Sequence, residues 1–317
     1  MEELTLLILG AGWTATFLIP LLQSRNVPFA ATTTSGHPVA DVPTLSFKFD
    51  PSAPEHETLS AIAALPRARY VLVTFPLTGT GPSKLLIETY TATHRSGNNN
   101  AAGEKKKNSD IRFIQLGSSG IWQQQQQQNS CWITRHSPYA TTNPRALAED
   151  ELRSLGGCVL NLAGLWGGGR TPRNWAGRVA PTKEAVREKR SLHLIHGDDV
   201  ARVVVAVVDG GCGWEDDDKM WEVSGRGQRW LVTDGFVYDW WALLVGWADG
   251  GGGGDKEKEK GPGVVTSEQQ RAGWVFELMR EEGVRALPRS MEALGRCYDT
   301  REFWEAFGLV PLKGRVC

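Results

Sequence analysis

The chain has 317 residues, of which 41% are hydrophobic, and its 35 basic and 36 acidic side chains leave a formal net charge of −1. This balance argues against a nucleic-acid-binding or membrane-surface protein, because both need an excess of positive charge. Five cysteines without paired spacing predict reduced thiols, and six scattered histidines predict no metal site. The length suffices for one large α/β domain, or for a core domain with a small lobe.

The chain begins with a predicted strand, a glycine turn and a helix. Leu6–Leu9 is a short apolar run typical of a buried strand, and residues 13–22 predict a helix that Pro20 should kink or shorten. Between them, Gly10, Gly12 and Ala15 have the spacing of the dinucleotide fingerprint. The first glycine permits the turn, the second lets a diphosphate approach the backbone, and the small alanine lets the helix pack on the strand.

The uncharged run from residue 4 to residue 22 does not have the pattern of a signal peptide or a membrane span. It follows Met1-Glu2-Glu3, which is acidic where a signal peptide is basic, and it is interrupted by two glycines and Pro20. We therefore expect a cytoplasmic protein whose partners include neither a membrane nor a nucleic acid.

Strands and helices alternate through the first half of the chain. The expected strands after the first are Val27–Ala31, Leu45–Phe49, Tyr70–Thr74 and Ile111–Leu116, and the expected helices are Glu55–Leu65 and Pro82–His94. This alternation predicts a doubly wound parallel α/β sheet, Rossmann-like, with ligands at the carboxyl ends of the strands. The residues expected to bind the cofactor there are Gly10, Gly12, Trp13, Thr14, Ala15, Thr33, Thr34, Thr74, Phe75 and Pro76.

The end of the second strand bears on the choice of cofactor. An acidic residue there would bind the ribose of NAD, whereas a basic residue would favour the extra phosphate of NADP. This chain has Thr32-Thr33-Thr34-Ser35, which offers four hydroxyls and no acid to repel a phosphate. We therefore expect NADP as the preferred cofactor, with NAD as the alternative.

Three segments have the composition of disordered surface inserts. They are the polar residues 96–110, residues 123–129 with their run of glutamines, and the glycine- and lysine-rich residues 249–263. Around them we expect a dinucleotide-binding core over 1–170, with core elements again at about 191–223, and a small C-terminal substrate lobe over most of 171–317. The expected lobe helices are Asn174–Lys189, Gly235–Trp247 capped by Thr233-Asp234, Ser267–Glu282 and Arg301–Phe307.

Four segments, taken together, resemble the extended and atypical short-chain dehydrogenase/reductase superfamily, also called the NAD-dependent epimerase/dehydratase family. They are LGAGWTA at the N-terminus, LGSSGIW over 116–122, CVLNLAGLWGGGR over 158–170 and HLIHGDDVARVVVAVV over 193–208. The resemblance implies an NAD(P)-dependent oxidoreductase or epimerase fold and a small-molecule substrate, and it leaves a homodimer open.

The catalytic pattern of the family is incomplete in this chain. The family uses a Ser or Thr, a Tyr as acid/base, and a Lys four residues after the Tyr. Counting from Tyr139 puts Asn143 in the place of the lysine, whereas counting back from Ala148-Glu149 puts Arg145 there and Thr141 in the place of the tyrosine. An arginine can hold a ribose, but it does not lose its proton, and threonine is a poor acid.

Other residues take their expected roles from the same resemblance. Ser118 falls in the place of the family's hydroxyl residue, so the expected catalytic set is Ser118, Tyr139 and Arg145. Ser119 beside it and Arg170, after three glycines, are expected to bind the substrate. Asp198 and Asp199 precede an apolar run and are expected to cap its helix rather than to catalyse, with a structural role for His196.

Two functions from different classes stay open. The first is an atypical NADP-preferring oxidoreductase or epimerase, in which Tyr139 or a bound water supplies the proton. The second is a non-catalytic NAD(P)-binding regulatory or scaffold protein. The missing Tyr/Lys pair favours the second, whereas the intact Gly-Gly-Gly-Arg loop and the C-terminal lobe favour the first.

Overall fold

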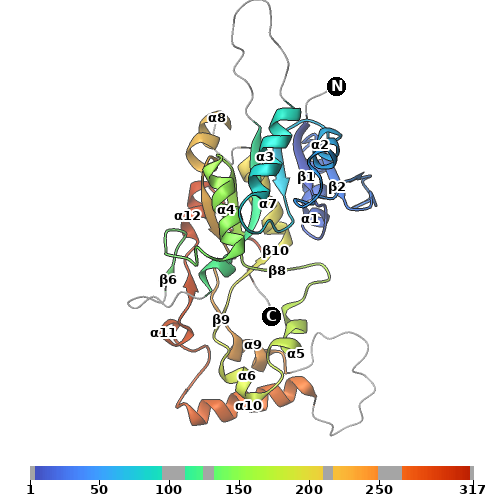
Figure 1. Cartoon of the computed structure of the whole chain (residues 1–317). Coiled ribbons are helices and arrows are strands. Elements are labelled where there is room, and N and C mark those ends of the chain that lie inside the picture. Colours follow the sequence, from blue (N-terminus) through green and yellow to red (C-terminus); the bar gives the residue numbers. More distant parts are fainter. Residues whose placement is uncertain (1–3, 95–110, 124–131, 210–216, 249–265, 315–317) are drawn as a thin grey trace, which may run out of the picture.

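Seven parallel strands form the central sheet, and helices cover both of its faces (Figure 1). The computed structural model describes residues 4–94, 111–123, 132–209, 217–248 and 266–314. The strand order is β11-β7-β5-β4-β1-β2-β3, and every neighbouring pair runs parallel. The strands are β1 (Leu4–Leu9), β2 (Phe29–Thr33), β3 (Leu45–Ser46), β4 (Ala68–Val73), β5 (Arg112–Ser118), β7 (Cys158–Leu162) and β11 (Arg229–Val232). This arrangement confirms the predicted doubly wound α/β fold.

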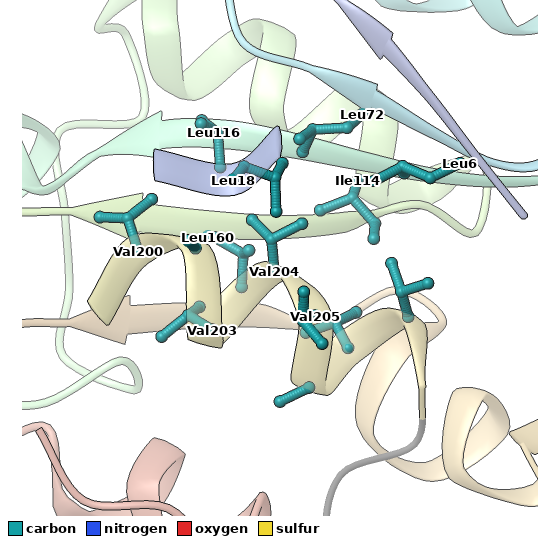
Figure 2. Packing of buried hydrophobic residues seen from close by; sticks show 14 of the residues in the cluster. Leu6, Leu18, Leu72, Ile114, Leu116, Leu160, Val200, Val203, Val204 and Val205 are labelled. Atoms are coloured by element: carbon teal, nitrogen blue, oxygen red, sulfur yellow. The ribbon is translucent and has the colours of Figure 1, made fainter. Parts of the chain in front are cut away.

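Each face of the sheet is buried by its own group of helices. The helices are α1 (Ala15–Ser24) and α7 (Gly197–Val208) on one face, and α2 (Glu55–Ala63), α3 (Pro82–Thr93) and α4 (Pro144–Ser154) on the other. Figure 2 shows valines of α7 packed among Leu72, Ile114 and Leu160 of the sheet. The valines of α7 are buried against the sheet and against α1, which packs on the same face.

The strand order reverses direction between β1 and β4. From β1 the sheet extends through β2 to β3 on one side, and from β4 through β5 and β7 to β11 on the other. In such sheets the crevice at the carboxyl ends of the two diverging strands binds the ligand. The turn after β1 and the residues after β4 meet there, since the amide of Thr74 donates to Leu9 O at 3.1 Å.

A smaller group of helices lies apart from the sheet and has its own apolar core. In Figure 1, α5, α6, α9 and α10 gather below the sheet. Trp240, Trp241 and Trp247 are all buried in this core, so the tryptophans of α9 and the turn after it are packing residues. The remaining helices of the described chain are η1 (Ser119–Trp122), η2 (Pro172–Trp175), α5 (Ala176–Val179), α6 (Lys183–Arg187), α8 (Asp217–Met220), η3 (Trp221–Gly225), α9 (Trp240–Gly246), α10 (Ser267–Glu281), α11 (Met291–Leu294) and α12 (Arg301–Ala306).

Three short strand pairs lie outside the seven-stranded sheet. They are β8 (Gly164–Trp166) with β10 (Leu194–His196), β9 (Ser191–Leu192) with β12 (Tyr238–Asp239), and β6 (Trp132–Ile133) with β13 (Cys297–Tyr298). In the described part of the chain, no helix combines the length and the apolar character needed to cross a bilayer.

Several predicted elements have different bounds. The second strand begins and ends two residues later than expected, the third is only two residues long, and α1 begins at Ala15 but continues through Pro20. The expected helix Asn174–Lys189 is wrong, because Pro181 has no N–H to donate and the chain breaks there into η2, α5 and α6. Residues 221–223 form a π-helix rather than a return to the sheet, and the edge strand is β11.

The predicted caps of two helices are also wrong. Thr233 and Asp234 accept from the amides of Gly235 and Phe236 in a turn, and the helix begins only at Trp240, where Asp239 accepts from Trp241 N. The first helix after β10 is capped by a histidine instead of an aspartate.

His196 is the N-cap of α7, where its Nδ1 accepts from Asp198 N at 3.1 Å. Asp199, buried in the first turn, instead accepts from the backbone amides of Leu312 and Lys313. The predicted inserts at 96–110 and 249–263 lie outside the described residues, as does the insert at 123–129 apart from Gln123.

Candidate functional site

The turn after β1 is held in shape by the two strands beside it. Gly10 has a φ of +88°, and a Cβ there would come within 2.8 Å of Thr74 Oγ1. Its amide donates to Thr32 Oγ1 at 3.1 Å, and the Thr74 hydroxyl bonds back to the carbonyls of Leu9 and Gly10. Only glycine fits this position, because it has no side chain and tolerates the backbone conformation.

The space in front of Gly12 is open, in contrast to that at Gly10. A Cβ built on Gly12 would have Gly10 O, at 3.9 Å, as its nearest neighbour. The backbone amides of Trp13 and Thr14 have no acceptor among the described residues, and the first turn of α1 carries no acidic residue. Free amides at a helix N-terminus attract anions, so this cradle fits the diphosphate of a dinucleotide. Ala15 is buried where α1 packs on the sheet, as its size predicts.

The threonines after β2 differ in their surroundings. Thr33 is buried, and its hydroxyl lies 2.9 Å from Thr44 Oγ1 and 3.5 Å from His37 O. Thr34 is exposed at the strand end, where a ribose or its phosphate would lie in this fold.

The residues after β4 lie beside the glycine turn. The ring of Phe75 comes within 3.0 Å of the position of a Cβ on Gly10 and stacks on Phe49, with ring centroids 6.1 Å apart. Pro76 is exposed next to it. The structure therefore brings the three predicted cofactor segments, after β1, β2 and β4, to one edge of the sheet.

Ser118 lies at the carboxyl end of β5, with its hydroxyl partly engaged. Its Oγ accepts from the amide of Gly120 at 3.1 Å, as the N-cap of η1. The hydroxyl proton has no acceptor among the described residues, so the group keeps one hydrogen bond to donate. The next residue, Ser119, accepts through its carbonyl from the Tyr298 hydroxyl at 3.0 Å.

Arg145 reaches from α4 to the same strand end. Its guanidinium donates to Leu116 O at 3.2 Å and lies 4.0 Å from a carboxylate oxygen of Glu149. Its Nε is buried and has no hydrogen-bond partner among the described residues. Asn143 has a different task, because its side chain accepts from Arg145 N and caps α4. Arg145 therefore contacts β5 near its carboxyl end, whereas the side chain of Asn143 caps α4.

The hydroxyl of Tyr139, unlike that of Ser118, already donates a hydrogen bond within the protein. Its hydroxyl donates to Asp150 at 2.7 Å, its ring packs on Trp122, and the guanidinium carbon of Arg229 lies 4.4 Å from the ring centroid. Burial and the nearby Asp150 carboxylate raise the pKa of Tyr139, which is the wrong direction for an acid near neutral pH. The geometry therefore separates Tyr139 from the role that the family pattern implies.

A buried polar network that the sequence did not single out supports the end of β5. Glu149 is fully buried and accepts from Asn161 Nδ2 at 2.7 Å, from Ser118 N at 3.1 Å and from Arg229 at 3.2 Å. Burial raises the pKa of Glu149, and the hydrogen bond from Asn161 opposes the rise. The Ala148-Glu149 pair was visible in the sequence, but its partners come from β7 and β11 and no local pattern connects them.

A pocket of about 970 Å³ is lined by residues of β6, β13, α12 and the segment after α12. It is lined by Trp132, Tyr298, Trp304 and Val310, among others, and Tyr298 is the residue that contacts Ser119. Behind it, burial lowers the pKa of His193 to about 3, so the neutral ring accepts from Tyr298 N at 3.1 Å.

Arg170 lies over the glycine turn. The loop that carries it is tied to this turn by Trp13, whose Nε1 donates to Gly167 O at 3.1 Å. The guanidinium carbon of Arg170 lies 4.5 Å from the centroid of the same indole. Within the described part of the chain, no group of three or more His, Cys, Asp or Glu side chains is arranged to hold a metal ion.

Comparison with known proteins places the fold. No protein-family model matches the sequence, and no curated protein matches it. Among solved structures, a short-chain dehydrogenase/reductase superfamily protein of Agrobacterium tumefaciens, solved with bound NAD, has a TM-score of 0.56 at 9% identity over 98% of this chain and 93% of that one. A proposed NAD-dependent epimerase/dehydratase of Methylobacillus flagellatus has a TM-score of 0.55 at 16% identity over 93% and 97%.

A UDP-glucose 4-epimerase of Thermotoga maritima, solved with UDP-glucose, has a TM-score of 0.52 at 14% identity over 96% of this chain and 93% of that one. At these identities the likeness concerns the fold. The chain therefore has, over nearly its whole length, the fold of the NAD-dependent epimerase/dehydratase and short-chain dehydrogenase/reductase proteins.

Proposed function

We propose that this protein binds a nicotinamide dinucleotide at the turn after β1 and acts as an atypical oxidoreductase or epimerase on a small molecule. The observation that carries the proposal is the contrast between two glycines. Gly10 has no room for a side chain, whereas Gly12 faces open space beside free amides at the start of α1. A turn needed only for folding would require the first feature but not the second.

Different residues at this edge of the sheet bind different parts of the cofactor. The turn from Gly10 to Ala15 holds the diphosphate, the exposed Thr34 and the segment from Thr74 to Pro76 flank the adenosine half, and Arg145 holds the nicotinamide end. The bound dinucleotide supplies a hydride donor or acceptor. NADP remains our preferred cofactor because of the threonines after β2, whereas the NAD-bound Agrobacterium structure supports NAD as the alternative.

The groups near the substrate have simpler tasks. Ser118 donates its remaining hydrogen bond to a substrate oxygen, and Ser119 lies beside it at the end of β5. A water molecule, rather than Tyr139, supplies the proton, because the Tyr139 hydroxyl already donates to Asp150 and its pKa is raised. Positioning against the cofactor then provides most of the rate enhancement.

The pocket lined by Tyr298 is our candidate for the substrate side of the site, because the Tyr298 hydroxyl donates to Ser119 O. Its aromatic walls suit a flat or ring-shaped group, in line with the UDP-glucose in the Thermotoga structure. We accordingly assign residues 1–170 to cofactor binding and most of 171–317 to the substrate. A cytoplasmic location and a homodimer are further proposals that depend on the sequence and on the resemblance.

One observation favours the non-catalytic alternative. The hydroxyl of Tyr139 is bound within the protein, and no described residue takes the place of the family's acid/base beside Ser118. A protein that only senses the dinucleotide needs the glycine turn but not this group. Product formation from candidate carbonyl substrates with bound NADPH separates the two functions.

Dinucleotide binding is tested first by calorimetric titration and thermal shift with NADPH and NADH. A ligand at about 100 times its Kd stabilises the fold by roughly 2.7 kcal/mol, which is a readily measured shift. Gly12→Val fills the open space and should abolish binding while the unliganded protein keeps its Tm within a few degrees. Gly246→Val, at an equally open glycine of α9, is the control and should bind normally.

The outcomes are distinct. Wild-type protein that binds neither dinucleotide would overturn the proposed function. Wild-type binding that survives Gly12→Val unchanged would show that the dinucleotide binds elsewhere.

A further inference from the structure

The loop that carries Arg170 has a fixed shape and packs against the start of α7. Gly167 and Arg170 exchange both of their backbone hydrogen bonds, at 2.9 and 3.0 Å, which closes the loop into a tight hairpin. Gly167 has a φ of +109° and Gly168 a φ of +55°, so this turn depends on glycine. A Cβ on Gly167 would lie 2.3 Å from the His196 ring, so the hairpin is also packed against the start of α7.

The hairpin and the glycine turn share one side chain. The indole of Trp13 donates to Gly167 O at 3.1 Å, and the guanidinium carbon of Arg170 lies 4.5 Å from the indole centroid. Trp13 follows Gly12 directly, so the platform beneath Arg170 is part of the anion cradle itself. The ring of Trp13 is fixed in turn by an edge-to-face contact with Phe17 of α1, at 4.9 Å between centroids.

The guanidinium is exposed, and its described contact is with the face of an aromatic ring. Among the described residues it makes no ion pair and no hydrogen bond, in contrast to Arg145, Arg173 and Arg229. A guanidinium on an aromatic face keeps its N–H donors directed outward, where two of them can bind one oxyanion together.

We infer that Arg170 binds the diphosphate of the dinucleotide, with Trp13 as its positioning residue, instead of binding an anionic group of the substrate. This inference rests on the proposed function, because it assumes that the dinucleotide lies at the turn after β1. The positive charge of Arg170 then lies opposite the amides of α1, and the diphosphate is held from two sides. The Gly-Gly-Gly-Arg hairpin is thus a cofactor clamp.

The experiment measures Kd by calorimetry for NADPH, NADH, ADP-ribose and AMP. Arg170→Ala should weaken binding of each ligand that contains a diphosphate by roughly tenfold to a hundredfold, the range of a charge-assisted hydrogen bond. AMP, which lacks the diphosphate, should lose less than about threefold. Arg178→Ala removes an equally exposed arginine from α5 and should change each Kd less than about twofold.

Two conservative variants test the geometry. Arg170→Lys keeps the charge without the fork and should recover part of the affinity. Trp13→Phe keeps an aromatic face but loses the hydrogen bond to Gly167 O, and should weaken binding less than Arg170→Ala does. Added salt should weaken binding to wild-type protein more than binding to Arg170→Ala, because the exposed charge is screened.

Four outcomes distinguish a failure of the inference on Arg170 from a failure of the proposed function. An unchanged Kd for ADP-ribose in Arg170→Ala, with NADH weakened, would place Arg170 on the nicotinamide half and overturn the inference. A loss confined to NADPH would place it on the ribose phosphate, with the same consequence. Equal losses for AMP and ADP-ribose would show an unspecific charge effect and would also overturn it. Wild-type protein that binds none of the four would overturn the proposed function, and the inference with it.

Discussion

Asn161 and Glu149 hydrogen-bond to the backbone carbonyl and the backbone amide of Ser118, respectively. The Asn161 amide donates to Glu149 Oε2 at 2.7 Å and to Ser118 O at 3.0 Å, while Ser118 N donates to Glu149 Oε1 at 3.1 Å. All three residues come from different elements, namely β5, α4 and β7. The candidate hydroxyl is therefore positioned by a buried network, and disturbing that network should affect both stability and the site.

Glu149→Ala should destabilise the protein by roughly 3–5 kcal/mol, because Arg229 loses one of its two carboxylate partners and the buried amides of Asn161 and Ser118 lose their acceptor. Equilibrium unfolding in denaturant measures the loss. Glu188→Ala, at an exposed glutamate, is the control and should change stability by less than about 0.5 kcal/mol. A loss below about 1 kcal/mol for Glu149→Ala would mean that the network is not a structural element.

Gly117→Ala should destabilise the fold by roughly 1–3 kcal/mol, because the network leaves no room for a methyl group. A Cβ there would lie 2.6 Å from Asn161 Nδ2 and 2.7 Å from Glu149 Oε1. The matched substitution Gly273→Ala meets no atom within 4 Å in the exposed part of α10, and should stabilise by about 0.5–1 kcal/mol through its helix propensity. Thermal unfolding of both variants should therefore show shifts of opposite sign.

The parts of the fold that were predicted from sequence are those with local causes. The strand, the glycine turn and the helix at the N-terminus follow from an apolar run and from the two glycines, each of which has a steric reason at its own position. Helices α2, α3, α10 and α12 end within two residues of their predicted bounds, because the sequence patterns that predict them lie within the segment.

The predictions that failed depended on distant residues. Asp199 was expected to cap α7, but it binds the backbone of Leu312 and Lys313, more than a hundred positions away, and His196 takes the cap. The role of Tyr139 also depends on contacts that the sequence does not show. Its hydroxyl binds Asp150 and its ring lies against Arg229, and no spacing in the sequence predicts these contacts.

Arg145→Ala should weaken dinucleotide binding, whereas Asn143→Ala should lower stability. Removing the guanidinium that lies against Leu116 O should weaken NADPH or NADH binding by roughly tenfold, if Arg145 holds the nicotinamide end. Removing the cap of α4 should lower stability by about 1 kcal/mol and leave the Kd unchanged. Titration and unfolding of each variant supply both values, and a larger loss of affinity in Asn143→Ala would reverse the assignment.

Asp234 should make the stability of the protein depend on pH near neutrality. Burial raises the pKa of its carboxyl to about 7, from 3.8, and the charge of Asp199 adds to the rise. Because the folded state holds this proton more tightly than the unfolded state, the stabilisation is complete below about pH 4 and is lost as the pH rises through about 7, by about 1.4 kcal/mol for each pKa unit.

Asp234→Asn removes this titration while its amide oxygen can still accept from Phe236 N and its amide nitrogen can face the Tyr238 hydroxyl. The difference in unfolding free energy between variant and wild type, measured in denaturant at pH 5, 6, 7 and 8, should therefore move in favour of the variant as the pH rises. His193, whose pKa is lowered to about 3, acts in the opposite direction below about pH 6.5, but it is present in both proteins and cancels in the difference. A difference that stays constant over this range would mean that Asp234 is ionised in the folded protein throughout.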